Sequence, residues 1–359
     1  MAAGVALSSL LLTSAASGAD RSINVYNWSD YIDESVLKTF TTETGIKVVY
    51  DVFDSNELLE TKLLAGASGY DVVVPSGTFL ARQIQAGVFG KLDFSKLPNR
   101  KNMWDVVTAR TAMYNPGNAY AVNYMWGTTG IGFNVDEVKK RAPDAPLDSW
   151  ALLFDEKHAT RLKECGIHVL DAPNELIPAA LNYLGKDGNS HEPDEIREAA
   201  ALLEKVRPYV QKFHSSEYIN ALANGDICLA VGWSGDIFQA RARADEAKNN
   251  VKVTYIIPKE GAQMWFDMMA IPADARNPDD AHAFINFMMR PEIISKASNY
   301  VFYANGNKAS QPMLNPAILK DPAVYPDDAT LDKLFVTTPY SAKVQRVVTR
   351  AWTKVKTGQ

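Results

Sequence analysis

The stretch INVYNWSDYID, residues 23–33, combines a short apolar strand with an unusual ending. Ile23, Val25 and Tyr26 are residue types that favour β-strands. A buried first strand ordinarily ends in a small polar turn. This one is followed by NWSDY, residues 27–31, in which two large aromatic rings flank one carboxylate. A turn alone does not explain why aromatic and acidic residues stand at the end of this strand.

Outward from this stretch, apolar strands alternate with amphipathic helices. The spacing predicts a helix over 35–45, a strand over 46–53, a helix over 56–66, a buried strand over 70–76 and a helix around 79–87. Strand–helix–strand–helix at this pace is typical of parallel βαβ units. The first half of the chain is therefore predicted to form an α/β lobe.

A second α/β series follows GTTGIGFNVDEV, residues 127–138. It comprises a strand at 166–173, helices at 194–206 and 216–225, a strand at 226–236, further strands within 251–275 and a helix at 278–298. No repeat and no Gly/Ser linker separates the halves, which favours two lobes joined by extended crossings. Ligand sites in such proteins lie in the cleft, at the carboxyl ends of strands.

Composition limits the function classes. The chain has 359 residues, 47% hydrophobic and 22% charged, with a net charge of −5. Its length suits two ordinary lobes rather than one core. No cluster of Lys and Arg is interleaved with aromatic residues, which argues against nucleic acid as a partner.

The N-terminus, MAAGVALSSLLLTSAASGA at residues 1–19, resembles a secretory signal. Its apolar core, residues 5–12, is too short to span a bilayer. Residues 17–19 give a small-x-small cleavage pattern that places the mature start near Asp20. No Lys or Arg precedes the core, so either the signal's start is truncated or the segment is an apolar tail. We expect an exported protein, and no later stretch is apolar enough for a membrane helix.

Two cysteines occur, Cys165 and Cys228. In an oxidising compartment they would close a long loop, worth about 4 kcal/mol in the chain-entropy model. Two buried free thiols are the alternative.

Motifs of common enzyme classes are absent from the sequence. It contains no P-loop, no complete dinucleotide fingerprint, no H-E-x-x-H, no C-x-x-C and no G-x-S-x-G. Its five histidines are scattered without an i, i+4 pair. We therefore predict that the protein is not an enzyme and has no cofactor or metal, although a metal-free hydrolase would escape this search.

The pairing of an aromatic side chain with a carboxylate recurs at two further strand ends. Trp233 precedes Asp236 in VGWSGDIF, and Trp265 precedes Asp267 in MWFDMM. Residues two apart on an extended segment point to the same face. Each pair alone is explained by core packing or helix capping. Three such pairs at expected cleft ends favour a binding site.

A flexible alkyl ammonium suits such walls. Its methylenes lie between flat rings, and each nitrogen gains a cation–π attraction of about 0.5–2 kcal/mol. Burying a cation without a partner is costly, so a carboxylate must meet each nitrogen. A sugar site ordinarily carries more Asn, Arg and Lys, and an amino-acid site needs a cation for the α-carboxylate. The pattern therefore predicts a linear polyamine as the ligand.

The longer motifs resemble one family. YNWSDYI, TGIKVVYDVFDS, YMWGTTGIGFNVDEV, FHSSEYINALANGDICLAVGWSGD and TRAWTKVK, among others, are similar to the periplasmic polyamine-binding proteins of ABC importers, in the putrescine/spermidine-binding branch. The resemblance covers essentially the whole mature chain.

The resemblance implies an α/β, type II periplasmic-binding fold of two lobes that close over the ligand by hinge motion. Each lobe is expected to be a mixed sheet flanked by helices. We expect residues 20–133 and 257–310 in lobe 1, 134–256 in lobe 2, and 311–359 as a C-terminal segment packing across both. It also implies a Cys165–Cys228 disulfide, a periplasmic location of the Gram-negative type, an inner-membrane ABC permease as partner, and a monomer.

When the family's ligand-binding positions are carried over to the matching residues of this chain, the resemblance implies an aromatic box with carboxylates. Aspartates and Glu175 would neutralise ammonium groups, and the rings would enclose the alkyl chain. By residue type alone, Ser76 is equally a helix cap, Glu175 a solvated side chain and Tyr303 a packed tyrosine. The implied ligand-binding residues are Trp28, Ser29, Asp30, Tyr31, Ser76, Glu175, Trp233, Asp236, Trp265, Asp267 and Tyr303.

One position departs from the putrescine-preferring relatives, which carry Phe where this chain has Trp265. The wider indole offers a larger π-face. We read this as favouring spermidine over putrescine. Alternatives are a putrescine-preferring receptor of the same family, an exported amine-processing enzyme, and a sensor with the same fold.

Overall fold

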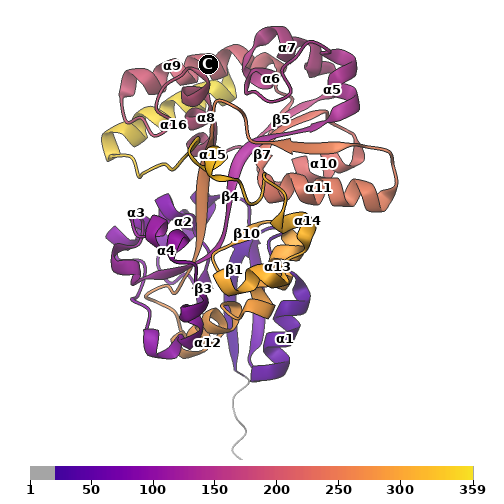
Figure 1. The fold of residues 1–359 in the computed structure, drawn as a ribbon. Helices are drawn as coiled ribbons and strands as arrows, with labels where there is room; N and C mark the ends of the chain where they lie inside the picture. The colour runs from indigo at the N-terminus through magenta and orange to yellow at the C-terminus, as the bar shows by residue number, and fades with distance from the viewer. Residues whose placement is uncertain (1–20, 359) are drawn as a thin grey trace, which may run out of the picture.

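The computed structural model of the chain describes residues 21–358. The predicted signal segment lies outside these residues. The described chain forms two lobes, one above the other in Figure 1, and long strands run between them. No helix within residues 21–358 has the length and apolar character needed to cross a membrane.

The strands are β1 (Ser22–Trp28), β2 (Lys47–Phe53), β3 (Val72–Val73), β4 (Ala121–Asn134), β5 (Ile167–Val169), β6 (Lys212–Phe213), β7 (Leu229–Trp233), β8 (Val253–Ile256), β9 (Ala262–Ala270), β10 (Ala304–Asn305) and β11 (Leu334–Phe335).

The α-helices are α1 (Glu34–Thr44), α2 (Asn56–Leu64), α3 (Gly77–Gln85), α4 (Asp105–Thr111), α5 (Val135–Arg141), α6 (Ala151–Phe154), α7 (Glu156–Leu162), α8 (Pro173–Tyr183), α9 (Pro193–Val206), α10 (Tyr218–Asn224), α11 (Ser234–Ala247), α12 (Pro278–Met288), α13 (Pro291–Val301), α14 (Pro316–Leu319), α15 (Asp328–Leu331) and α16 (Ala342–Thr357). Short 3-10 helices are η1 (Phe94–Lys96), η2 (Pro98–Asn102), η3 (Pro116–Asn118), η4 (Lys163–Cys165), η5 (Arg207–Tyr209) and η6 (Lys308–Met313).

Local sequence signals explain several boundaries. The Asp33 side chain caps α1 by accepting from the Ser35 backbone N–H, and α1 ends at Gly45, whose φ of 72° suits a residue without a Cβ. Ser55 caps α2 in the same way. The predicted helices at 35–45 and 56–66 are therefore confirmed to within a residue or two.

Each lobe contains a mixed sheet, as predicted. In lobe 1, β1 lies parallel to β2 and β3, and β9 runs antiparallel to both β3 and β4. In lobe 2, β4 runs antiparallel to β7 and β8, and β5 lies parallel to β6 and β7. Helices such as α1 and α12 pack on lobe 1, whereas α5 to α11 belong to lobe 2 (Figure 1).

β4 joins the lobes directly. Its residues through Thr128 pair with β9, and from Thr129 onward they pair with β7. The boundary expected after residue 133 therefore falls within the part of β4 that already belongs to the second sheet. β4 is buried along its whole length, including its polar residues Asn123, Thr128, Thr129 and Asn134.

The C-terminal segment contacts both lobes. β11 pairs with β9, and the Tyr114 hydroxyl donates to the Thr337 carbonyl oxygen at 2.6 Å. In α16, the Trp352 indole N–H donates to Asp171 of lobe 2 at 3.0 Å, and Gln345 accepts from Arg82 of lobe 1 at 3.2 Å.

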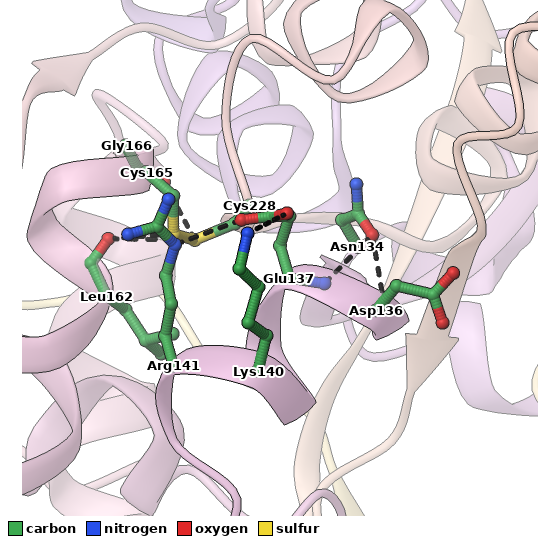
Figure 2. The surroundings of a disulfide bond; sticks show 9 residues. All are labelled: Asn134, Asp136, Glu137, Lys140, Arg141, Leu162, Cys165, Gly166 and Cys228. Carbon is green, nitrogen blue, oxygen red and sulfur yellow. Dashed lines mark hydrogen bonds and ion pairs between the residues drawn. A yellow bond between two sulfur atoms is a disulfide. The ribbon is translucent and has the colours of Figure 1, made fainter.

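The predicted disulfide between Cys165 and Cys228 is present, with their Cα atoms 5.4 Å apart. Figure 2 shows it next to α5, beside Glu137 and Arg141, which form an ion pair at 3.0 Å. Cys228 immediately precedes β7. The bond therefore braces lobe 2 beside the strand that ends in Trp233.

Candidate ligand-binding site

A cleft between the lobes gathers all of the predicted site residues except Asp30. Its empty space is about 500 Å³, part of it open to solvent. The lining residues are Trp28, Ser29, Tyr31, Phe53, Asp54, Asn56, Ser76, Glu175, Ser215, Ser216, Ile219, Trp233, Asp236, Trp265, Asp267 and Tyr303.

The cleft residues stand at the ends of strands and the beginnings of helices. Trp28 ends β1 and Trp233 ends β7. Asp236 and Glu175 lie in the first turns of α11 and α8. Ser76 is the N-cap residue of α3, although its side chain makes no capping bond. The end of the first strand therefore forms one wall of the cleft, which explains why aromatic residues such as Trp28 and Tyr31 stand there.

Aromatic rings from both lobes meet in the cleft. The ring centroids of Trp28 and Trp233 lie 5.4 Å apart across the interlobe boundary. Tyr303 lies 5.2 Å from Tyr31 and 5.4 Å from Trp265, both edge to face. The Trp28 indole N–H donates to the Val74 carbonyl oxygen at 2.9 Å, which fixes that ring. The predicted aromatic residues thus form two groups of touching rings, Trp28 with Trp233 and Tyr303 with Tyr31 and Trp265, that line the same cleft.

Asp236 is 7% exposed and bonds only to neutral donors. The Tyr218 and Tyr303 hydroxyls each donate to one of its oxygens at 2.7 Å. Burial raises the pKa of Asp236 to about 6, against the lowering effect of the two hydroxyls. Since Tyr303 comes from lobe 1, this carboxylate also joins the two lobes.

Asp267 has a similar environment and is 4% exposed. The Ser76 hydroxyl donates to one oxygen at 2.6 Å and the Tyr31 hydroxyl to the other at 2.8 Å. Burial raises the pKa of Asp267 to about 7. Hydroxyl donors orient a carboxylate without neutralising it, so its charge remains available to a cation.

Glu175 is the third carboxylate. The Thr129 hydroxyl donates to it at 2.5 Å, and the Gln263 amide donates to its other oxygen at 3.3 Å. Burial raises the pKa of Glu175 to about 8, with a smaller contribution from the charge of Asp267. Without a cation, the lobe interface holds this carboxyl largely in its protonated form near neutral pH.

The charge of the lining is one-sided. Asp54, Glu175, Asp236 and Asp267 face the cleft, and no Lys, Arg or His is among its lining residues as the structure describes them. Buried carboxylates without cationic partners are costly unless a ligand supplies the positive charge. Residues 21–358 contain no cluster of three or more His, Cys, Asp or Glu arranged to hold a metal ion. The site therefore suits an organic cation.

Acidic residues also stand at the helix ends of the cleft. A helix N-terminus carries about half a positive charge and favours anions. Both α8 and α11 begin at this cleft, and each places a carboxylate in its first turn, Glu175 and Asp236 respectively. These acidic side chains offset the positive helix ends and offer acceptor oxygens, so the cleft favours cations over anions.

Asp30 is the one predicted site residue that does not line the cleft in this structure. Its carboxylate pairs with Arg243 of α11 at 2.8 Å, and its backbone carbonyl accepts from Gln239 at 3.2 Å. Both partners belong to lobe 2. Because a guanidinium lies within reach, Asp30 bridges the two lobes through this ion pair.

Several lining residues were missed from sequence. Phe53 is the last residue of β2, Asp54 and Asn56 follow it, and Ser215, Ser216 and Ile219 lie around the start of α10. The sequence carried one usable signal for the first group, because strand ends form the cleft and the strand predicted over 46–53 ends at Phe53 and is followed by DSNE. No feature of the local sequence marks Ser215 and Ser216 as cleft residues.

Comparisons with known proteins agree with this geometry. The model of the family described as bacterial extracellular solute-binding protein matches residues 35–326. The putrescine-binding periplasmic protein SpuD of Pseudomonas aeruginosa is 54% identical over 346 residues, covering 96% of this chain and 94% of SpuD. The putrescine-binding periplasmic protein PotF of Escherichia coli is 52% identical over 341 residues, covering 94% and 92%.

A solved structure also matches. The spermidine/putrescine ABC transporter substrate-binding protein PotD of Streptococcus pneumoniae aligns with a TM-score of 0.75 at 31% identity, covering 94% of this chain and 98% of that one. Fold and cleft thus define a two-lobed binding protein of the type II periplasmic class. The chain belongs to the bacterial extracellular solute-binding protein family. Its relatives bind solutes for transport, which confirms the prediction that it is not an enzyme.

Proposed function

We propose that the protein is a periplasmic receptor that captures polyamines and delivers them to the membrane permease of an ABC importer. One observation carries the proposal: an aromatic cleft holds three carboxylates, Glu175, Asp236 and Asp267, whose bonding partners are neutral hydroxyl and amide groups. Ammonium groups would supply the missing positive charges.

The ligand would lie along the aromatic wall. Its methylenes would pack along the wall to which rings such as Trp28 and Trp233 belong, and each ring would contribute about 0.5–2 kcal/mol where a nitrogen lies over its face. Because the two tryptophans come from different lobes, ligand contacts would favour the closed cleft. Closure would then be the state that a permease recognises.

The names of the relatives support the transport role. SpuD and PotF are periplasmic putrescine-binding proteins, and PotD is the substrate-binding protein of a spermidine/putrescine ABC transporter. We extend this to the present chain as a periplasmic protein acting as a monomer beside an inner-membrane permease.

For ligand length, we propose spermidine over putrescine. Trp265 lies in the cleft against Tyr303 and enlarges the aromatic wall, and three carboxylates match three nitrogens. Putrescine preference is the second candidate, because the two relatives above 50% identity are both named for putrescine.

Titration of the refolded, ligand-stripped protein with putrescine, spermidine and spermine tests both levels, with tryptophan fluorescence as the readout. Arginine and a neutral sugar are the controls. Saturable binding of polyamines alone supports the receptor. Tighter putrescine binding would overturn the length preference only, and no polyamine binding would overturn the function.

A further inference from the structure

Gln263 is a buried amide beside the carboxylate of Glu175 and is 6% exposed. Its Nε2 group donates to Glu175 at 3.3 Å. Its Oε1 atom is buried and has no hydrogen-bond partner within residues 21–358. A buried acceptor without a donor is unfavourable, so this oxygen is suited to a donor that arrives with a ligand.

Gln263 shares a strand face with two residues of the cleft. Gln263, Trp265 and Asp267 alternate along β9, and side chains two apart on a strand point to the same side. The strand is held at this point by β11, whose Phe335 pairs with Gln263. Gln263 is therefore the next side chain in the row that already supplies an aromatic wall and a carboxylate.

The cleft continues past the aromatic box to reach Gln263. A second chamber with about 520 Å³ of empty space shares Trp28, Glu175, Trp233 and Trp265 with the first. It extends to the first turns of α3 and α8 and to Thr337 of the C-terminal segment. Its lining includes Asp54, Glu57 and Glu175 and, among the residues described, no Lys, Arg or His. This chamber also suits a cation.

We propose that Gln263 determines ligand length: with Glu175 it forms an end subsite for a primary ammonium or guanidinium group, the far terminus of a ligand with three nitrogens. The inference rests on the proposed function. Gln263 acts in two ways, by positioning Glu175 through its Nε2 group and by accepting from the ligand through Oε1.

The chemistry of the end group follows from the free acceptors. Each carboxylate oxygen of Glu175 already accepts one bond, from Thr129 or from Gln263, and keeps a second lone pair. A primary ammonium has three N–H donors, enough for Glu175 and for the Gln263 amide oxygen together. A group with a single N–H cannot satisfy both.

Distance favours a three-nitrogen ligand. Gln263 and Asp267 are four residues apart on β9, which is about 13 Å of strand at 3.3 Å per residue. Nine single bonds of a three-nitrogen chain, drawn out as a zigzag, cover roughly 11 Å, whereas the five bonds of a four-carbon diamine cover roughly 6 Å. A diamine therefore reaches Asp267 or Gln263, but not both.

The test measures selectivity in Gln263→Met, which keeps the length and removes both polar atoms. We expect spermidine to bind roughly tenfold more weakly and putrescine to change less than about threefold.

Gln83→Met is the matched control, because Gln83 is also a buried glutamine with unpartnered polar atoms but lies in α3 outside both chambers. It should leave the ratio of spermidine to putrescine affinity unchanged. Equal weakening of both ligands in Gln263→Met, or no change in either, would overturn the assignment of Gln263. A wild-type protein that binds neither ligand would instead overturn the proposed function and the subsite with it.

Discussion

Asp144 and Asp267 are both hydrogen-bonded aspartates, but they lie in opposite electrostatic environments. On the surface of lobe 2, Asp144 accepts from Lys157 and Arg161, each at 2.5 Å, and these bonds hold its pKa well below the usual range. In the cleft, Asp267 accepts from two hydroxyls, and burial raises its pKa to about 7.

The difference shows that the cleft carboxylates, unlike Asp144, are not neutralised by cationic side chains of the protein. Asp144 is already neutralised by its own chain, so it has little to offer a ligand. Asp267, Asp236 and Glu175 are oriented by neutral donors, and their desolvation remains uncompensated until a cation arrives. The closed, ligand-free cleft is therefore electrostatically strained in a way that a polyamine relieves.

The largest expected effect comes from removing a cleft carboxylate. Asp267→Asn or Asp236→Asn should weaken polyamine binding at least about tenfold, because a desolvated charge pair is lost. Calorimetric titration gives the affinity, and circular dichroism checks that the variant is folded. Asp144→Asn is the control and should leave affinity unchanged. Full affinity in a folded Asp267→Asn protein would remove Asp267 from the site.

The same substitution should act on stability in the opposite direction. Between about pH 4 and pH 7 the folded, ligand-free protein holds a proton on Asp267 that the unfolded chain has lost, so this group's contribution to stability declines as pH rises through that window. Asp267→Asn should therefore raise the melting temperature at pH 8 by several degrees, about 2–4 °C for each kcal/mol released.

Differential scanning calorimetry without ligand checks this. The gain should shrink at pH 5, where the wild-type carboxyl is protonated, and Asp144→Asn should show no gain. A lower melting temperature for Asp267→Asn at pH 8 would mean that the carboxylate is stabilised rather than strained in the empty cleft.

The smallest effect concerns the interlobe pair outside the cleft. The side chains of Asp30 and Arg243 are 44% and 32% exposed, and exposed pairs of this kind contribute little. Asp30→Asn or Arg243→Ala should weaken ligand binding less than about fivefold, and less still at high salt. A tenfold loss in Asp30→Asn alone would instead return Asp30 to the ligand.

Sequence predicted the α/β lobes and most of the cleft, because strand ends and aromatic–carboxylate pairs are local features. Trp28, Trp233 and Asp267 could be nominated from spacing of a few residues. The partners of the carboxylates could not: Tyr218 and Tyr303 meet at Asp236 from different lobes. The ion pair of Asp30 could not be predicted for the same reason, because Arg243 is distant in sequence.

The position at which β4 passes from pairing with β9 to pairing with β7 could not be predicted from the local sequence either. β4 is buried on both sides of the crossing, so burial does not mark the position. Only the pairing with β7 and β9 defines the position.

The central claim is that a polyamine displaces protons from buried carboxylates that lack cationic partners. It is tested most directly by isothermal titration of the ligand-stripped protein with spermidine at pH 7, in two buffers of different ionisation enthalpy. The raised pKa values of Asp267 and Glu175, about 7 and about 8, predict saturable binding with release of protons, seen as a heat that depends on the buffer. Absence of binding, or identical heats in both buffers, would contradict the account.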